Sequence, residues 1–562
     1  MAAKRTHRYG ARIALIEASA AFSGRTGVGC AVGLLFARLL ARDLPMPWPA
    51  NARSGTLLRP AAGALLLATA LTGPPLAAQA TSTSVQKFQH SPAAAFDAFG
   101  RAVSVQGDHA LVTALGVDAT GAAFGFRRSG GIWTQSQKFH GNDTAYGDAF
   151  GLEAQIAGEF AVVSSHQTDL GGMFNAGAAY VFRDDGTNWV QLQKLVAPDP
   201  AAFDFFSYSV AMAGDLVVVG AIDDDDGGNL TGSAYVFRRS GATWVFEQKL
   251  HASNPDPEDE FGFDIETDGQ TIVVASPVDS NGGIATGSVY VFRHNGASWV
   301  ETQRISPVDG DDGCWFGWDL DLDGERLAVG APERDLTKND GGAVYTYLDN
   351  GTSFVPEDEF APSKLSASDV FGWSVSLQGD RLVAGAPSTT IAGGLPFDGA
   401  VYLFHFDGTR WVEVHQWVSS DEAVDEWPVP NLGQSCSLDG TTVFVGAPFH
   451  DGGVNNSGAA YRFELADLGL DAVPDAAPAG GSMTLHTDGG LAGAKTALLL
   501  TNLGGTPLTY VVWVTTFDLQ GKTALSFVVP PAVAGLQATF LSAGFWNDGP
   551  FALSNAVTVT FQ

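Results

Sequence analysis

One unit of about 55 residues recurs seven times along this chain, and this repeat limits the possible folds more than any other feature. In its clearest copy, residues 371–411, the unit begins with Phe-Gly and continues as a short alternating strand and a Gly-Asp turn. An apolar run ending in Gly-Ala-Pro follows, then Gly-x-Val-Tyr-x-Phe and a turn into Trp. A period of this length is typical of propellers and solenoids, in which each repeat is one supersecondary unit.

The Phe-Gly element marks the start of each unit, at intervals of 51 to 61 residues. Its seven positions are Phe99-Gly100, Phe150-Gly151, Phe206-Ser207, Phe261-Gly262, Phe316-Gly317, Phe371-Gly372 and Leu432-Gly433. A Gly-Ala-Pro corner, or a variant of it, follows each one. Because short alternating runs bounded by Gly, Pro and Asp predict strands, each unit is expected to supply four of them.

The fourth strand of the unit, Trp-Val-x-x-Gln-Lys-Leu, is present after only six of the seven units, because the last unit stops at Gly458–Phe463. The missing copy lies at the other end of the repeats, as Ser84–Phe88. A first strand that completes the last blade closes a ring and removes open sheet edges. Residues 81–466 are therefore predicted to form an all-β, seven-bladed β-propeller closed by an N-terminal strand.

The Phe-Gly and Gly-Ala-Pro units resemble the FG-GAP repeats of integrin α-subunit propellers and of secreted bacterial proteins. The resemblance covers about 380 residues and implies a propeller that works in binding or adhesion. In integrins a calcium loop, Asp-x-Asp-x-Asp-Gly-x-x-Asp, lies between the first two strands of a unit. Here only Asp319–Gly324 is similar, and Leu327 replaces the last acid, so we expect an ordinary strand and turn there.

Residues 1–80 are predicted to be an N-terminal extension and a signal peptide rather than part of the fold. Two arginines precede the apolar run Ala61–Leu71, and Ala78-Gln79-Ala80 supplies a small-x-small cleavage pattern after which we expect cleavage. The run is too short for a membrane span. Translation is expected to start at Met46, and an uncleaved anchor is the alternative.

After the repeats the sequence pattern changes to longer expected strands, and no repeat is present. Residues 467–480 are predicted to be a linker, and residues 481–562 a small C-terminal β-sandwich. The strands expected there are Lys495–Thr501, Leu508–Thr515, Ala524–Pro530 and Ala556–Phe561. This module is interpreted as a surface-retention device or a cap.

Composition and motifs narrow the classes of function. A formal net charge of −31 argues against nucleic-acid binding, which needs basic patches. Three cysteines exclude a disulfide scaffold, and no bridge is predicted between Cys314 and Cys436. No nucleophile elbow, zinc-protease helix or phosphate-binding loop is present, so the protein is predicted not to be an enzyme.

The long loops after Gly-Ala-Pro and before Phe-Gly lie on one face of a propeller, and they carry many of the acidic residues. Loops on a rigid scaffold are the usual place for binding. If these loops hold a metal, Ca²⁺ is expected, because it takes six to eight oxygen ligands. The candidate ligands are Asp223, Asp224, Asp225, Asp226, Asp309, Asp311 and Asp312. The alternative is that these acids only keep the protein soluble.

These observations predict a monomeric protein that is secreted or held at the cell surface, with no membrane span in its mature chain. Its predicted function is binding or adhesion, with the acidic loop face meeting an extracellular protein or glycan. Two alternatives stay open. One is a propeller lyase or glycosidase, which needs paired carboxylates or a cluster of His, Arg or Tyr at one mouth of the central channel. The other is a structural component of a surface layer or matrix.

Overall fold

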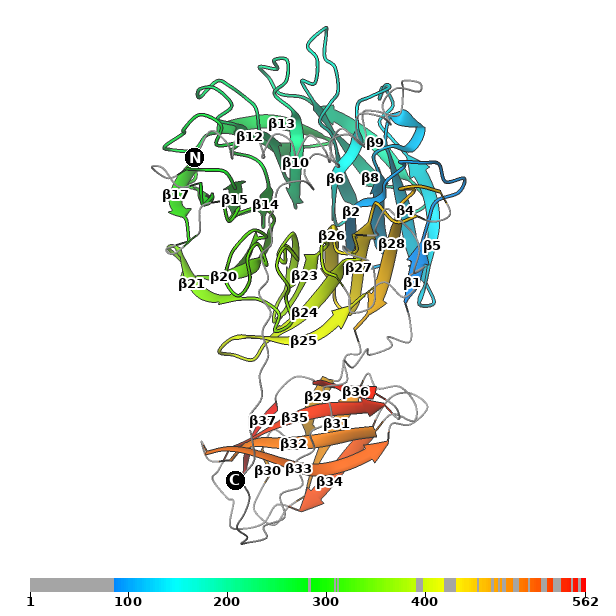
Figure 1. Ribbon diagram of the computed structural model, residues 1–562, viewed down its shortest axis with the longest axis vertical. Helices are drawn as coiled ribbons and strands as arrows, with labels where there is room; N and C mark the ends of the chain where they lie inside the picture. The colour runs from blue at the N-terminus through cyan, green and yellow to red at the C-terminus, as the bar shows by residue number, and fades with distance from the viewer. Residues whose placement is uncertain are drawn as a thin grey trace, which may run out of the picture. The chain divides into compact units, whose positions relative to one another are not determined.

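Seven antiparallel sheets of four strands each are arranged around an axis, and the protein is a seven-bladed β-propeller (Figure 1). The computed structural model describes residues 85–280, 285–307, 310, 313–390, 398–418, 431–451 and 454–465, and then the strands of the C-terminal region. The predicted signal peptide lies outside these residues. None of the described residues belongs to a helix that is long and apolar enough to cross a membrane.

The blades follow the seven units in chain order. Blade 1 contains β2 (Phe99–Gln106), β3 (His109–Ala114), β4 (Ala122–Ser129) and β5 (Ile132–Phe139), with η1 (Val117–Ala119) between β3 and β4; blade 2 contains β6 (Phe150–Ala157), β7 (Phe160–Ser165), β8 (Ala178–Asp184) and β9 (Trp189–Leu195); blade 3 contains β10 (Phe206–Ala213), β11 (Leu216–Ala221), β12 (Ser233–Ser240) and β13 (Thr243–Leu250); blade 4 contains β14 (Ile265–Thr267), β15 (Thr271–Ser276), β16 (Ser288–His294) and β17 (Trp299–Ile305).

The remaining blades have the same order. Blade 5 contains β18 (Leu320–Asp323), β19 (Arg326–Ala331), β20 (Ala343–Asp349) and β21 (Phe354–Phe360); blade 6 contains β22 (Ser374–Gln378), β23 (Arg381–Ala386), β24 (Ala400–Phe406) and β25 (Trp411–Trp417); blade 7 contains β26 (Ser435–Asp439), β27 (Thr442–Ala447), β28 (Ala459–Glu464) and, from the start of the repeats, β1 (Gln86–Phe88). Figure 1 shows β5, β9, β13, β17, β21 and β25 at the rim, and β2, β6, β10, β14 and β26 nearer the axis.

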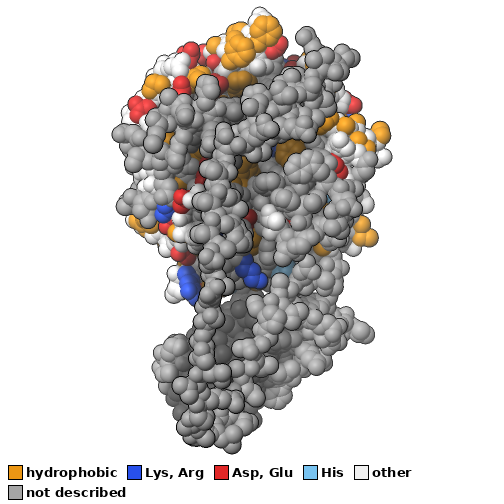
Figure 2. All heavy atoms as spheres, in the orientation of Figure 1, with side chains coloured by type: hydrophobic (Ala, Val, Ile, Leu, Met, Phe, Trp, Pro, Cys, Tyr) orange, Lys and Arg blue, Asp and Glu red, His pale blue; other side chains and the backbone are white. Residues whose placement is uncertain are grey.

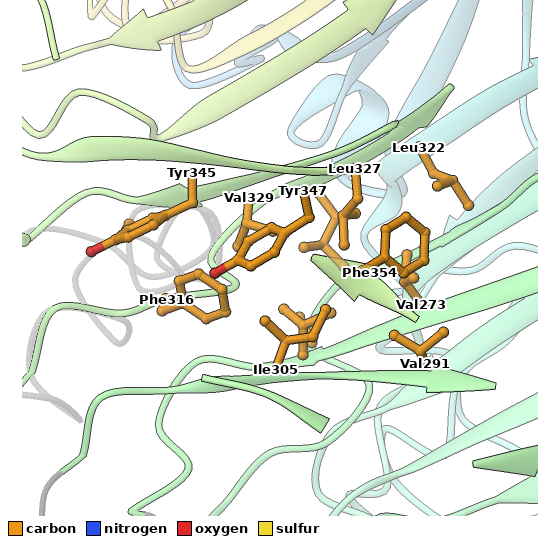
Figure 3. Packing of buried hydrophobic residues seen from close by; sticks show 14 of the residues in the cluster. Val273, Val291, Ile305, Phe316, Leu322, Leu327, Val329, Tyr345, Tyr347 and Phe354 are labelled. Atoms are coloured by element: carbon orange, nitrogen blue, oxygen red, sulfur yellow. The ribbon is translucent and has the colours of Figure 1, made fainter. Parts of the chain in front are cut away.

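The Phe of each Phe-Gly element packs at the junction between two blades. Phe316 is completely buried, and its ring contacts Tyr345 at 5.1 Å between centroids. Blade 5 side chains around Phe316 form one cluster with Val273, Val291 and Ile305 of blade 4 (Figure 3). Burial of each such ring contributes about 1.5–3 kcal/mol, so the repeated Phe is a structural residue.

The Gly of the same element is required because the backbone of the preceding blade in the ring passes very close to it. Gly100 has φ +95°, and a Cβ there would lie 2.2 Å from the carbonyl oxygen of Ala459 in blade 7. In blade 3 a serine takes this place. Ser207 adopts φ 73° and is fully buried, and its hydroxyl donates to the Ala178 carbonyl at 2.6 Å. That hydrogen bond offsets part of the strain of a positive φ.

Polar side chains join the innermost strands of neighbouring blades. In each case an oxygen on one blade accepts a hydrogen bond from a backbone N–H of the next. The pairs are Ser104 with Ile156, Glu153 with Val210, Asp264 with Leu320, Asp319 with Val375, Ser376 with Leu438, and Ser437 with Val105. The last pair connects blade 7 to blade 1. Between blades 3 and 4 the side chain is the donor, because the Ser209 hydroxyl donates to the Gly262 carbonyl at 2.8 Å. With this bond, every junction between neighbouring blades is bridged.

A second set of bonds joins the strands at the rim, and it explains the Gln of the fourth strand. The Gln193 side-chain amide donates to the Trp244 carbonyl at 2.7 Å and accepts from the Trp244 N–H at 2.8 Å. Gln137, Gln248 and Gln303 make the same pair of bonds to the next blade. Gln86 of β1 donates in the same way to the Trp133 carbonyl, at 2.9 Å.

Strand β1 lies antiparallel to β28, with Lys87 opposite Tyr461 and Phe88 opposite Ala460. Phe88 is 7% exposed and packs between Phe126 of blade 1 and Phe444 of blade 7. The first strand of the repeats therefore contacts the first and the last blade.

The C-terminal region contains two further sheets. One has the order β29 (Gly469–Val473), β31 (Ser482–Asp488), β34 (Thr523–Val528); the other has β30 (Ala476–Ala477), β37 (Val557–Phe561), β35 (Gln537–Trp546), β32 (Lys495–Leu503), β33 (Thr506–Thr516), with β36 (Gly549–Leu553) beside β35. Two short strands, β29 and β30, lie within the predicted linker. β29 belongs to a sheet because it pairs with β31. Packing of these sheets as a sandwich stays a prediction.

Candidate functional site

The acidic loop after β11 is one of the two segments predicted to bind calcium, and the structure places a cation of the protein itself within it. Asp224 is 2% exposed, and its Oδ2 accepts a hydrogen bond from the Tyr235 hydroxyl at 2.5 Å. Lys249 Nζ lies 2.8 Å from Asp224 and 2.5 Å from Asp226. Burial opposes the charge of Lys249, but bonds to both aspartates hold its pKa above the usual value. Ca²⁺ would have to displace this ammonium group.

The same arrangement of a tyrosine, a loop acid and a rim-strand cation recurs in other blades. Asp143 accepts from the Tyr180 hydroxyl at 2.8 Å and pairs with Lys194 at 2.7 Å. In blade 4 the members are Tyr290, Asp279 and Arg304, and in blade 5 the charges are exchanged, so that Arg334 of the loop pairs with Glu359 of the rim strand. Many acids of the loop face thus neutralise internal cations and contribute to stability.

The other predicted calcium ligands have different outcomes. Asp225 is exposed, and Asp223 is partly exposed in the same loop. Asp309, Asp311 and Asp312 lie outside the described residues, and calcium binding there stays a prediction. In the described ranges, no group of three His, Cys, Asp or Glu side chains is arranged to hold a metal ion.

The Asp-x-Asp-x-Asp segment that resembles a calcium loop forms strand β18, as expected from its alignment with the other units. Its three carboxylates point along one edge of the strand. Asp319, Asp321 and Asp323 each accept a hydrogen bond at 2.6 Å, from the N–H groups of Val375, Leu377 and Gly379 respectively. Because strand residues two apart are separated along the strand, these carboxylates match three alternate amides of blade 6 and do not converge on one ion.

Carboxyl groups from three different blades gather around the propeller axis, and this group was not predicted from the sequence. We call the group the axial carboxyls: Glu153, Asp264, Glu266, Asp319 and Asp321. Glu153 accepts from the Val210 N–H at 3.1 Å, and the Gln155 amide donates to Glu266 at 3.1 Å. Asp264 is 6% exposed, and the other four keep part of their surface open to solvent.

Burial and mutual repulsion raise the pKa of the axial carboxyls. Burial raises the pKa of Glu153 to about 7 and that of Asp321 to about 6. The pKa values of Asp264, Glu266 and Asp319 lie well above their usual range, first because of burial and then because other axial carboxyls surround them. Some members of the group therefore hold protons near neutral pH.

The variant Glu153→Gln should be more stable than the natural protein at pH 8. A carboxyl whose pKa is raised in the folded state stabilises it below the ordinary value of 4.5, and this contribution is lost as the pH rises to about 7. Gln keeps the acceptor for Val210 and carries no charge. We expect a gain of about 2 kcal/mol at pH 8 and almost none at pH 4, in urea titrations.

The matched control is Asp323→Asn, which changes an exposed carboxyl that makes the same kind of bond to the next blade. This variant should change stability by less than about 0.5 kcal/mol at either pH. A gain by Glu153→Gln of equal size at pH 4 and pH 8 would contradict the role given to its charge.

Four aromatic side chains from four consecutive blades form a continuous ladder beside the axial carboxyls. They occupy one position of the repeat, directly after Phe-Gly. Tyr208 contacts Phe263 at 5.3 Å between ring centroids, Phe263 contacts Trp318 at 4.8 Å, and Trp318 contacts Trp373 at 4.6 Å. We call this group the aromatic ladder. Phe263 is buried, whereas Tyr208, Trp318 and Trp373 are each partly exposed.

The ladder covers only blades 3 to 6. The corresponding positions in the other blades hold Arg101, Leu152 and Gln434, so the aromatic surface is one arc of the ring. Trp315 stacks on Trp318 at 4.7 Å and supports the middle of the arc. The buried His166 lies 5.9 Å from Tyr208 at one end. Alignment of the seven units shows that aromatic residues recur at this position and that acids follow two of them, but it does not show that the rings are in contact.

On the visible face, the described side chains do not form a single acidic patch (Figure 2). On the face that Figure 2 shows, acidic and apolar side chains are interspersed, and few basic side chains are visible. Large exposed apolar residues occur in the long loops, including Tyr146, Phe174 and Phe203. The aromatic ladder differs from these scattered residues because its rings are in contact with one another.

Comparison with known proteins bears on the family and the fold. No curated protein sequence matches the chain. Among solved structures, a fungal alcohol oxidase in complex with copper has a TM-score of 0.40 and 10% sequence identity, over 84% of this chain and 98% of that one, a likeness too low to support an argument about function. The FG-GAP repeat model matches residues 133–182, 189–237, 244–292, 299–347, 356–404 and 411–463, which together are more than half of the chain. The chain belongs to the FG-GAP repeat family.

Proposed function

We propose that this protein is exported and acts outside the cell as a binding protein, and that it holds a glycan on the aromatic ladder. The proposal depends on the series of ring contacts that joins Tyr208, Phe263, Trp318 and Trp373. Partly exposed aromatic rings with polar groups beside them are typical of small-ligand sites and binding hot spots. The flat faces of sugar rings are apolar and suit such a surface, while sugar hydroxyls suit the axial carboxyls.

The ladder is a better candidate than the acidic loop face as a whole. Loop acids such as Asp143, Asp224 and Asp279 are engaged by cations of the protein itself. The blade fold does not require an aromatic residue at this position, because blades 1, 2 and 7 have Arg, Leu and Gln there. Export is supported by the signal-like segment that precedes residue 81.

Trp318→Ala is the variant that tests this proposal. A glycan array should first identify a retained polysaccharide, and titration calorimetry should then measure its affinity. Loss of a central aromatic contact costs about 2 kcal/mol in typical binding sites, so we expect the Kd to rise by roughly 30-fold. Phe174→Ala is the control, because Phe174 is 61% exposed and outside the ladder. If Phe174→Ala weakens binding and Trp318→Ala does not, the ligand binds the loops and the proposal is wrong.

The axial carboxyls favour a second candidate function, hydrolysis of the bound glycan. A carboxyl that is protonated near pH 7 can act as a general acid, and a neighbouring ionised carboxylate can act as base or nucleophile. Glu153, with a pKa of about 7, is the candidate acid. This activity would be established if the natural protein releases reducing ends from a retained polysaccharide and the Glu153→Gln variant does not. Intact polysaccharide after long incubation would exclude it for that ligand.

A further inference from the structure

We propose that the glycan held by the aromatic ladder carries positive charge, and that it is a chain of amino sugars with free ammonium groups. This inference rests on the proposed function and specifies its ligand. An ammonium group is recognised where the face of an aromatic ring and a carboxylate lie together. The middle of the ladder has this composition, since Phe263 is followed by Asp264 and Trp318 by Asp319.

The contacts place these carboxyls at the same blade junctions as the aromatic pairs. Asp264 accepts from the Leu320 N–H at 2.6 Å and so crosses from blade 4 to blade 5, the junction that the Phe263–Trp318 contact also spans. Asp319 accepts from the Val375 N–H at 2.6 Å and crosses from blade 5 to blade 6, as does the Trp318–Trp373 contact. Each of these bonds uses Oδ2, one of the two carboxyl oxygens.

The electrostatic surroundings of these two carboxyls are negative. The charges that act most strongly on Asp264 are those of Asp319 and Glu153, and Asp319 is affected by Glu153, Asp321 and Glu266. The loop acids differ, because lysine or arginine side chains neutralise them. Arg101 of blade 1 acts on Glu153 at the other side of the group. The charges that act most strongly on Asp264 and Asp319 themselves are all acidic, so a cation placed against Phe263 and Trp318 would meet a negative field.

A buried imidazole at the end of the ladder indicates that the ligand also offers hydrogen-bond acceptors. His166 is 2% exposed and packs against Tyr208. The Gln167 side-chain amide nitrogen, which can only donate, lies 3.3 Å from Nε2 of His166, so the proton of the neutral ring is on Nδ1. Burial lowers the pKa of His166 to about 3, which keeps the ring neutral. Among the residues that the structure describes, its Nδ1 has no hydrogen-bond partner.

An unsatisfied buried donor is costly, and a ligand that supplies an acceptor recovers that cost. A sugar hydroxyl or ring oxygen is such an acceptor, whereas a simple polyamine has none. Ammonium groups for Asp264 and Asp319, and oxygen acceptors for His166, occur together in an amino-sugar chain. This combination distinguishes the proposed ligand from neutral glycans and from aliphatic polycations.

Titration calorimetry with two oligosaccharides tests the inference. The glucosamine hexamer is cationic at pH 6, and the N-acetylglucosamine hexamer has the same backbone without charge. We expect the purified protein to bind the glucosamine hexamer at least tenfold more tightly, with an affinity that falls as salt rises. Binding should release protons from the axial carboxyls, which is measured as a different apparent heat in buffers of different ionisation enthalpy.

The double variant Asp264→Asn/Asp319→Asn keeps both acceptors for the neighbouring blades and removes the charges. It should lose at least tenfold in affinity for the glucosamine hexamer, while Asp323→Asn, an exposed carboxyl of the same strand, should bind as the natural protein does. Melting curves of both variants establish that they are folded.

Three outcomes overturn the inference, and they separate it from the proposed function. If the acetylated hexamer binds as tightly as the glucosamine hexamer, or if the double variant keeps its full affinity, the ladder binds glycans without selecting charge. If spermine competes as well as the glucosamine hexamer does, the site selects charge alone. If neither hexamer nor any glycan on an array binds, the proposed function itself fails.

Discussion

Gly342→Ala is expected to lower the free energy of unfolding by about 4 kcal/mol. Losses of this size are typical of substitutions that create a severe clash. Gly342 begins the third strand of blade 5 with φ +89°, and it forms an isolated parallel bridge with Phe371 of blade 6. A Cβ on Gly342 would lie 2.0 Å from the carbonyl oxygen of Phe371 and 2.5 Å from its nitrogen. Because both contacts are with backbone, the two blades would have to separate.

Gly351→Ala is the matched control for this variant. Gly351 has nearly the same backbone conformation, φ +87°, but a Cβ there would have no neighbour within 4 Å in the part of the chain that the structure describes. Its replacement should cost only the strain of a left-handed conformation, about 1 kcal/mol. Urea denaturation followed by tryptophan fluorescence measures both variants. Equal losses in the two variants would show that the positive φ, and not the approach of blade 6, explains the loss of stability in Gly342→Ala.

Removal of strand β1 is expected to have an effect of similar size. A protein that starts at Gln89 would lack Phe88, whose ring lies 4.8 Å from that of Phe126 and 5.5 Å from that of Phe444. Loss of a buried phenylalanine costs about 3–5 kcal/mol, and the hydrogen bonds of Gln86 and of the strand add to this. We expect the Tm to fall by about 10 °C relative to a protein that starts at Thr81.

The shortened protein also exposes the edge of β28, and an unpaired edge invites association with other chains. We therefore expect dimers or larger species in light scattering. A synthetic peptide of residues 81–88 should restore both the Tm and the monomer, because it can occupy the vacant edge. An unchanged Tm without the strand would show that the propeller is held closed by the inner bonds between blades 7 and 1 alone, such as that from Val105 to Ser437.

The local features of the fold were predictable because the residues that determine each strand and turn lie within a single repeat. Phe-Gly, the turn and Gly-Ala-Pro act within one unit, so the four strands of each blade and the count of seven followed from spacing alone. The family assignment was also within reach of the sequence. The segment Asp319–Asp323 was correctly expected to be a strand, because it aligns with the first strand of the next unit.

The site could not be predicted in the same way, because its members belong to different units. Trp318 and Trp373 are one repeat apart in sequence, and only the closed ring brings their rings to 4.6 Å. The acidic loop of blade 3 is a similar case. A run of four aspartates indicates a metal, but Lys249 is brought beside Asp224 and Asp226 by the pairing of β12 with β13. A run of acidic residues in the sequence does not reveal whether a metal ion or a side chain of the protein neutralises it.

The repeat, the strands, the number of blades and the family could all be predicted from the amino-acid sequence, because they depend on contacts within a unit or on a pattern that every unit shares. The acids that bind lysine or arginine, the carboxyls that gather at the axis and the aromatic rings that are in contact are known only from the folded chain. This is because the ring turns equivalent positions of successive units into neighbours, and the side chains at those positions differ from unit to unit.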